Sequence, residues 1–240
     1  MTPAGPTARG ALVVVGATGG CGTSLLAGAL ALAWQRAHGA TWLVELDLGR
    51  GDLADAWDLP GDRTIDDLAE VSDELAPHHL RAAAQPHPSG LAVLVAPPRP
   101  AAGWDAPAAA RLVATAGAGD GDRCVVDAGC GLRSHAIGAA ASARGVLVAC
   151  APRIAAARRA RHVVEGLARS APSARVGIVV CGGPGRSEIG ARALGRAVGA
   201  PVTGELPWSP READALSAGR WPARRRRGLA AAVAALAEAT

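Results

Sequence analysis

Lysine, phenylalanine and tyrosine are absent from this 240-residue chain, and its 25 basic residues are all arginines. Aromatic side chains that could stack on bases are scarce and the formal net charge is only +4, so the composition argues against a nucleic-acid partner. No apolar run is long and pure enough to cross a bilayer, and residues 1–10 lack the apolar segment of a secretory signal. We therefore expect a cytoplasmic protein.

Cysteine is present, but in an arrangement that disfavours metal sites and disulfides. The five cysteines are odd in number and show no C-x-x-C spacing. Most lie beside predicted strands, so we expect reduced, buried thiols. The histidines of the proline-rich segment 78–88 have no partner cysteines, which disfavours a metal role for them as well. The residues concerned are Cys21, Cys124, Cys130, Cys150 and Cys181, together with His78, His79 and His87.

The hydrophobic pattern predicts one α/β domain over residues 11–240, preceded by a disordered leader at 1–10. Segments with helical spacing alternate with short runs that are apolar throughout, which is typical of a mostly parallel sheet with helices on both faces. The sequence thus predicts a three-layer sandwich. Strands are expected at 11–15, 41–44, 91–96, 124–127, 145–150, 175–181 and 202–206, and helices at 23–37, 64–70, 105–116, 154–170, 187–198, 213–218 and 228–239.

A glycine-rich stretch, Gly16–Ser24, lies between the first predicted strand and the first predicted helix. A helix N-terminus offers unpaired N–H groups and a partial positive charge, so a glycine loop in this place is a candidate phosphate cradle. As a P-loop, the stretch places Ser24 where a hydroxyl would hold Mg²⁺ and Thr23 where the phosphate-binding lysine should be. As a dinucleotide loop, residues 16–22 resemble the G-A-T-G-x-x-G turn of short-chain dehydrogenase relatives.

Acidic residues follow two other predicted strands. Glu45 and Asp47 come after the strand at 41–44, and Asp127 ends the strand at 124–127. Ligands of open parallel sheets bind beyond the carboxyl ends of the strands, so we expect these carboxylates to lie beside the glycine loop.

That arrangement favours Mg²⁺ and water handling in a nucleoside triphosphatase. Short-chain dehydrogenase chemistry is excluded because it relies on a Tyr and a Lys, and the chain has neither. A non-catalytic NAD(P)-binding regulator, with Glu45 as the ribose-binding acid, remains an alternative.

The order and spacing of six segments resemble those of the ParA/MinD superfamily of deviant P-loop ATPases. The resemblance extends from Leu12 to about Leu236. It points to the CpaE/TadZ-like branch, which is associated with Flp (Tad) pilus assembly and secretion, and to related actinobacterial septum-site-determining proteins. It implies the P-loop NTPase fold of MinD and ParA. The segments are 13–24, 43–53, 88–98, 125–131, 151–158 and 204–210.

The resemblance also implies roles for individual residues. Asp47 matches the acid that positions the attacking water, which is its catalytic role if the protein is active. Ser24 and Asp127 would hold Mg²⁺, the second of them at the end of the Walker B strand, and the nucleotide would be ATP or ADP. The phosphates would lie against the glycine loop and the following switch turn. The nucleotide-binding residues implied in this way are Gly19, Gly20, Cys21, Gly22, Thr23, Ser24 and Gly131.

The chain departs from the family pattern at positions that carry charge. Thr18 occupies the place of the signature lysine that reaches across a nucleotide-sandwich dimer, and Thr23 that of the lysine that binds the transferring phosphate. Cys181 or Gly182 stands where an asparagine would read adenine. Loss of one preorganised donor typically costs about 3–4 kcal/mol. We therefore expect nucleotide binding that is weak or absent, and vestigial hydrolysis.

The function implied by the resemblance is that of a localisation or assembly factor for pilus, type II/IV secretion or septum-site machinery. The alternative is an active MinD/ParA-type ATPase that cycles on membrane or DNA. Pilus, secretion or cell-division proteins would be the partners of the chain, with a homodimer as a further expectation.

Two basic segments bear on where such a protein would lie. Arg224–Arg227 precede an Ala-rich helix, a combination that suggests peripheral contact with the inner face of the membrane, although a closing domain helix is favoured. The helix at 154–170 is expected to bury Ile154 on its apolar face and to turn its arginines outward. A solvated surface is favoured there over a partner or DNA surface.

Overall fold

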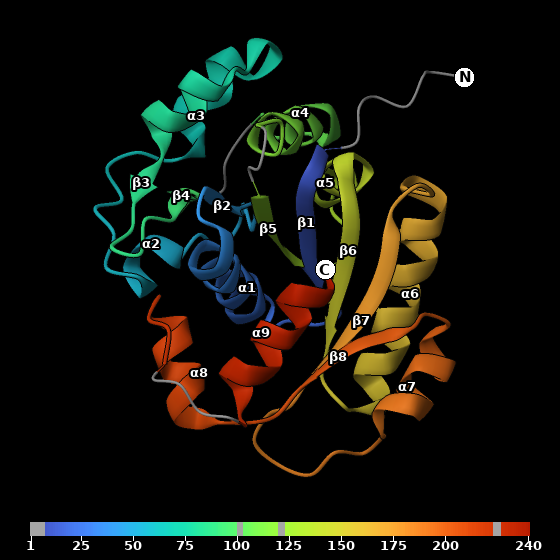
Figure 1. The fold of residues 1–240 in the computed structure, drawn as a ribbon. Helices are drawn as coiled ribbons and strands as arrows, with labels where there is room; N and C mark the ends of the chain where they lie inside the picture. The colour runs from blue at the N-terminus through green and yellow to red at the C-terminus, as the bar shows by residue number, and fades with distance from the viewer. Residues whose placement is uncertain (1–7, 100–102, 120–122, 223–226) are drawn as a thin grey trace.

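The structure is a computed structural model that describes residues 8–99, 103–119, 123–222 and 227–240. Within these residues, eight strands form one sheet in the order β3-β4-β2-β5-β1-β6-β7-β8 (Figure 1). All neighbouring strands are parallel except β3 and β4. The strands are β1 (Ala8–Gly16), β2 (Thr41–Glu45), β3 (Gln85–Pro86), β4 (Ala92–Leu94), β5 (Arg123–Cys130), β6 (Ala143–Cys150), β7 (Arg175–Cys181) and β8 (Val202–Leu206).

Helices cover both faces of the sheet, so the expected three-layer α/β sandwich is confirmed (Figure 1). In β1, Val13 and Val15 enter the core under α4, α5 and α6, whereas Leu12 and Val14 enter the core under α1 and α9. The helical elements are α1 (Thr23–His38), α2 (Leu53–Ala56), the 3₁₀ helix η1 (Ile65–Glu74), α3 (Pro77–Ala83), α4 (Ala106–Ala116), α5 (Ser134–Ser142), α6 (Ile154–Ser170), α7 (Ala191–Val198), α8 (Pro210–Ser217) and α9 (Leu229–Ala239).

The central strand β1 lies between β5 and β6, and the glycine loop leaves its carboxyl end. Because these strands are parallel, the carboxyl ends of β2, β5, β6 and β7 meet at the same edge of the sheet. The apolar run of β1 is buried on both sides, which keeps the start of the loop rigid. The topology therefore gathers the residues that follow these strands around the loop.

Several expected elements differ in the structure. The first strand begins at Ala8, so only residues 1–7 of the expected leader remain, and these lie outside the described residues. The helix α3, which carries His78 and His79, and the short helix α2 are not among the expected helices. α5 was not expected, because an Ala- and Gly-rich segment has few bulky residues to show a helical period.

The long helix α6 and the strands β7 and β8 have the bounds that the sequence predicted. The expectation for Ile154 is wrong, because this side chain, at the first turn of α6, is 54% exposed. The expected membrane contact falls on residues 224–227, of which 224–226 lie outside the described part. No helix in the described part of the chain combines the length and the apolar character needed to span a membrane.

Candidate functional site

The glycine loop depends on backbone conformations that side chains disfavour. Gly20 and Gly22 have positive φ angles of 72° and 88°. Gly22 is the N-cap of α1 and supplies no side-chain hydrogen bond to the helix. The N–H groups of the first turn of α1 therefore face the loop without a side-chain cap, and together with the helix dipole they form an anion-binding position.

Two side chains of the loop point inward. A Cβ atom on Gly16 would overlap the Thr23 hydroxyl, so this hydroxyl lies beneath the start of the loop. The Cys21 Sγ lies 3.4 Å from Thr23 Oγ1 and donates a hydrogen bond to the Ala149 carbonyl at 3.3 Å. Both side chains are buried. Thr23 therefore contributes to the packing of the loop, whereas a lysine in its place would extend toward a phosphate.

Ser24 and Asp127 form the polar pair next to the loop. Asp127 ends the apolar part of β5 and is 3% exposed, while Ser24 is exposed at the start of α1. Burial raises the pKa of the Asp127 carboxyl to about 6, and the nearby Ser24 hydroxyl and a hydrogen bond of 3.0 Å from the Gly129 N–H oppose this rise. A carboxylate and a hydroxyl in contact are oxygen ligands of the kind that Mg²⁺ takes, so the residues present fit that ion.

Glu45 has a structural role that differs from the ribose-binding role it would have in the NAD(P)-binding alternative. It is 2% exposed, so it does not reach a ribose. Its Oε1 accepts hydrogen bonds from the N–H groups of Asp52 and Leu53 at 3.1 and 3.2 Å, and its Oε2 accepts one from Ala96 at 2.8 Å. Burial raises its pKa to about 8, and the neighbouring Asp127 adds to the rise. Glu45 thus joins the loop after β2 to the end of β4.

Asp47 follows β2 and packs against the last residues of β5. Its half-buried carboxylate packs against Gly129, which has a positive φ of 68°, and a Cβ atom there would be 2.5 Å from Asp47 Cγ. Gly131 has a φ of 76° and donates a hydrogen bond of 2.9 Å from its N–H to the Gly16 carbonyl. Gly131 therefore connects the end of β5 to the first residue of the glycine loop.

Arginines near the loop were not identified from the sequence. The Arg50 guanidinium comes within 3.7 Å of where a Cβ on Gly19 would lie, and the Arg133 guanidinium within 3.8 Å of the corresponding point on Gly49. Both charges act on the half-buried thiol of Cys130. Because Arg50 and Arg133 lie in segments without periodicity, only the fold shows that they approach the site.

A pocket of about 590 Å³ adjoins the loop at Gly20. Its walls come from the segment after β7, the start of α6 and the segment after β8, including Trp208, which is 48% exposed. A Cβ on Gly182 would lie 2.8 Å from the Leu206 carbonyl oxygen and from the Trp208 N, so no larger residue fits there. The volume falls within the range of about 300–1,000 Å³ that small-molecule sites occupy.

Comparison with known proteins identifies the fold that carries this arrangement. No protein-family model matches the chain, and no curated protein matches it at a significant level. Among solved structures, the ParA family ATPase from Chlorobium tepidum TLS superposes with a TM-score of 0.81 at 18% identity, covering 97% of this chain and 98% of that one. The septum site-determining protein MinD from Pyrococcus horikoshii OT3, complexed with Mg-ADP, superposes with a TM-score of 0.77 at 18% identity, covering 95% and 94%. The fold is that of the ParA/MinD ATPases.

A ParA/MinD fold is a P-loop fold, as the sequence predicted. It is also the fold of a variant of Cyanothece McdA in complex with ATP, with a TM-score of 0.64 at 14% identity over 90% of this chain and 89% of that one. Within this fold, Asp127 lies beside Ser24 of the glycine loop, Gly131 bonds to Gly16, and Asp47 packs against Gly129.

The histidines and cysteines of the described residues form no metal centre. Within the described residues, no three His, Cys, Asp or Glu side chains are grouped to hold a metal ion. Cys21, Cys150 and Cys181 are buried thiols, as expected, and Cys130 is half-buried. Burial raises the pKa of Cys150 and of Cys181 to about 12, so both are protonated at neutral pH and unreactive.

Proposed function

We propose that this chain is a ParA/MinD-type P-loop protein of the CpaE/TadZ-like branch that binds a Mg²⁺–nucleotide weakly and hydrolyses it at a vestigial rate. In this proposal it acts as a localisation or assembly factor for pilus, secretion or septum-site machinery. The observation that carries the proposal is the contrast between two neighbouring residues of the loop. Ser24 keeps its contact with Asp127, whereas Thr23, in the place of the phosphate-binding lysine, is turned inward.

Binding in this proposal relies on the backbone. The N–H groups of Gly19–Ser24 would surround the phosphates, and Ser24 and Asp127 would hold the Mg²⁺ that neutralises them. Arg50, beside Gly19, supplies a positive charge near the loop, and the pocket next to Gly20 has room for the base and the ribose. Trp208 lines that pocket and offers a flat apolar surface.

Slow hydrolysis follows from the missing charges. Positively charged side chains that are already in position stabilise the charge that develops on the phosphoryl group during its transfer. Each such preorganised group is worth about 3–4 kcal/mol. Thr18 and Thr23 carry no charge, so the site lacks two of them. Asp47 alone would position a water molecule, which is of little use without charge stabilisation of the transition state.

The cellular role is proposed from the relatives. A solved relative with the same fold is the MinC:MinD complex from Aquifex aeolicus, which matches this chain with a TM-score of 0.73 at 18% identity, covering 96% of this chain and 95% of that one. We propose that this protein likewise acts through protein partners, as a cytoplasmic protein with peripheral contact at the inner face of the membrane. A homodimer formed across the nucleotide is part of the proposal.

Titration calorimetry of the purified full chain with ATP, ADP and NADPH, with and without Mg²⁺, tests the proposal. We expect Mg²⁺-dependent binding of ATP and ADP at micromolar or weaker affinity, no binding of NADPH, and loss of the Mg²⁺ effect in Ser24→Ala. Phosphate release should equal that of Asp47→Ala. Binding of NADPH alone would contradict the nucleotide assignment.

An active ATPase is the second candidate, because the chain retains Asp47 and places Arg50 beside the loop. Turnover at about 1 s⁻¹ or faster, abolished by Asp47→Ala, would establish this candidate in place of the first.

A further inference from the structure

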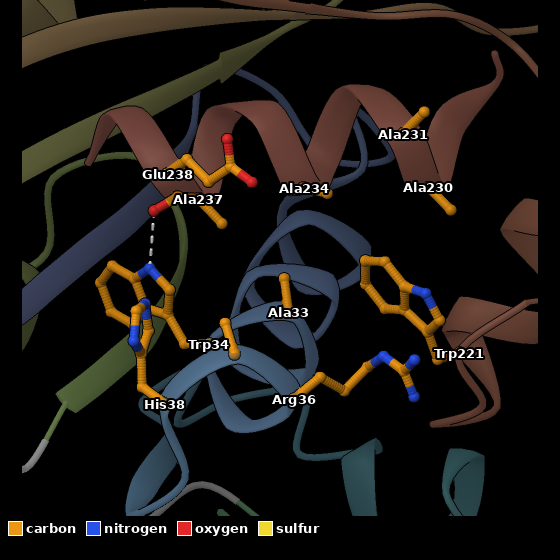
Figure 2. A pocket seen from close by; sticks show the side chains of 11 residues that line it. Ala33, Trp34, Arg36, His38, Trp221, Ala230, Ala231, Ala234, Ala237 and Glu238 are labelled. Carbon is orange, nitrogen blue, oxygen red and sulfur yellow. Dashed lines mark hydrogen bonds between the residues drawn. The ribbon is translucent and has the colours of Figure 1, made fainter. Parts of the chain in front are cut away.

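A second cavity lies at the opposite end of α1 from the glycine loop, between α1 and α9 (Figure 2). It has a volume of about 280 Å³, and alanine methyl groups form most of its surface. We call this feature the α1/α9 groove. Ala33, the first residue of α1 in its lining, lies ten residues or about 15 Å along the helix from Thr23, so the groove is no part of the nucleotide site. The alanines are Ala33, Ala37, Ala230, Ala231, Ala234 and Ala237.

Two indole rings stand at the ends of the α1/α9 groove (Figure 2). Trp34 is fully buried, and its Nε1–H donates a hydrogen bond of 2.9 Å to the Ala237 carbonyl. Trp221 is partly buried at the other end, beside the exposed Arg36, whose guanidinium lies 5.6 Å from the ring centroid. These contacts tie both α9 and Trp221 to α1, so each side of the groove is anchored to the same helix.

Positive charge lies near both ends of the α1/α9 groove, from Arg36 in its lining and from two arginines beside Trp34. Arg123 and Arg144 lie over the Trp34 ring, at 5.3 and 5.6 Å from its centroid. Arg36 is at the other end, and Glu238 is the one acidic residue in the described lining. In the described part of the chain, none of these three arginines is ion-paired with a carboxylate, and the Nη2 atom of Arg144 is buried without a hydrogen-bond partner.

The positive charges of neighbouring arginines repel one another around Arg144. The pKa of Arg144 is lowered by burial and by the neighbouring charges of Arg123 and Arg175. Arg123 and Arg144 at one end and Arg36 at the other have no acidic partners among the described residues, so both ends attract an anionic group from outside. Potentials of opposite sign across an interface speed association and reject wrong partners.

We propose that the α1/α9 groove is a docking site for an acidic amphipathic helix of a partner protein. One or two bulky apolar side chains of that helix would enter between the alanines of α1 and α9, where small residues let a third backbone approach closely. Carboxylates on its flanks would pair with Arg36 at one end and with Arg123 and Arg144 at the other. The proposal does not depend on nucleotide binding.

Selection from a displayed library of randomised helical peptides, with the purified full chain as the target, tests this proposal. We expect enriched peptides to carry apolar residues at i, i+3 or i+4, and i+7 together with Asp or Glu. The enriched peptides are then titrated against Arg36→Glu, which reverses an exposed charge at the groove, and against Ala234→Leu, which fills it. Arg158→Glu on α6 makes the same charge change at an exposed position elsewhere.

We expect the peptide affinity to fall by about tenfold or more in Arg36→Glu and in Ala234→Leu, and to stay within about twofold in Arg158→Glu. If Ala234→Leu does not fold, the comparison of Arg36→Glu with Arg158→Glu still tests the proposal. Both arginines are exposed, so we expect both charge variants to fold. The proposal is overturned if no peptide is enriched, if the enriched peptides are basic or uncharged, or if Arg36→Glu and Arg158→Glu bind them equally. It is also overturned if Arg36→Glu converts a dimer of the chain into a monomer, since a second copy would then cover the groove.

Discussion

The carboxylate of Asp47 lies directly over the α-carbon of Gly129, so that a Cβ atom at residue 129 would come within 2.5 Å of Asp47 Cγ. This contact places the acid that follows β2 against the carboxyl end of β5. Any side chain at residue 129 would push the carboxylate away. The contact therefore links the backbone of one strand end to the position of the acid proposed to handle water.

Gly129→Ala should destabilise the protein by about 1–3 kcal/mol, because alanine is strained at a φ of 68° and displaces Asp47. Urea unfolding followed by circular dichroism measures this change. Gly183→Ala is the matched control, since it has no positive φ and no atom within 4 Å of its added Cβ. Equal stabilities of the two variants would contradict the assigned contact.

Arg50→Ala should weaken ATP binding by about tenfold, or about 1.4 kcal/mol, because it removes a positive charge beside Gly19 in a loop that has no lysine. Titration calorimetry of the variant and the parent protein at low salt gives the ratio. Arg158→Ala, on the far helix α6, should leave the affinity unchanged. An unaltered affinity in Arg50→Ala would show that the backbone alone holds the phosphates.

Thr23→Lys should tighten ATP binding by about tenfold or more and should affect ADP less, since the added ammonium reaches the terminal phosphates. Fluorescent ATP and ADP analogues measure both affinities. Thr23→Met controls for the longer side chain without the charge. If Lys and Met at this position give the same affinity, the loop does not hold phosphates in the manner of a P-loop.

Glu45 should make the protein less stable as the pH rises from about 4.5 to 8. Its pKa is about 8 in the folded state and near 4.5 when exposed, so the folded chain holds the proton more tightly and loses this advantage as the pH increases. The limiting slope is about 1.4 kcal/mol per pH unit.

Urea unfolding at pH 6, 7 and 8 checks this sign, with Glu45→Gln as the comparison because it cannot ionise. Ionisable groups that do not interact with Glu45 contribute equally in both proteins, so the difference between the two curves reports Glu45 together with its interaction with Asp127. The parent protein should lose up to about 2 kcal/mol more than the variant between pH 6 and 8. Parallel curves would show that Glu45 does not take up a proton on folding.

Residues of the candidate site divide into those that the sequence could indicate and those that it could not. Ser24 and Asp127 follow a glycine loop and an apolar strand, and parallel strands bring such positions to one edge of a sheet. Arg50 lies in a segment with no period, so nothing in its surroundings indicates that it reaches Gly19. Glu45 was expected to face a ligand, because a sequence does not show which N–H groups will surround a carboxylate.

The amino-acid sequence by itself determined the three-layer α/β fold, because uniformly apolar strands alternating with helices can be buried only in a parallel sheet covered on both faces. It also determined that the loop Gly16–Ser24 has no lysine. Only the tertiary structure decided which groups surround that loop. The inward turn of Thr23 depends on the local conformation of the loop at Gly16 and Cys21. The approach of Arg50 to Gly19 and the hydrogen bond from Ala96 to Glu45 join residues distant in the chain, and the fold alone sets these distances.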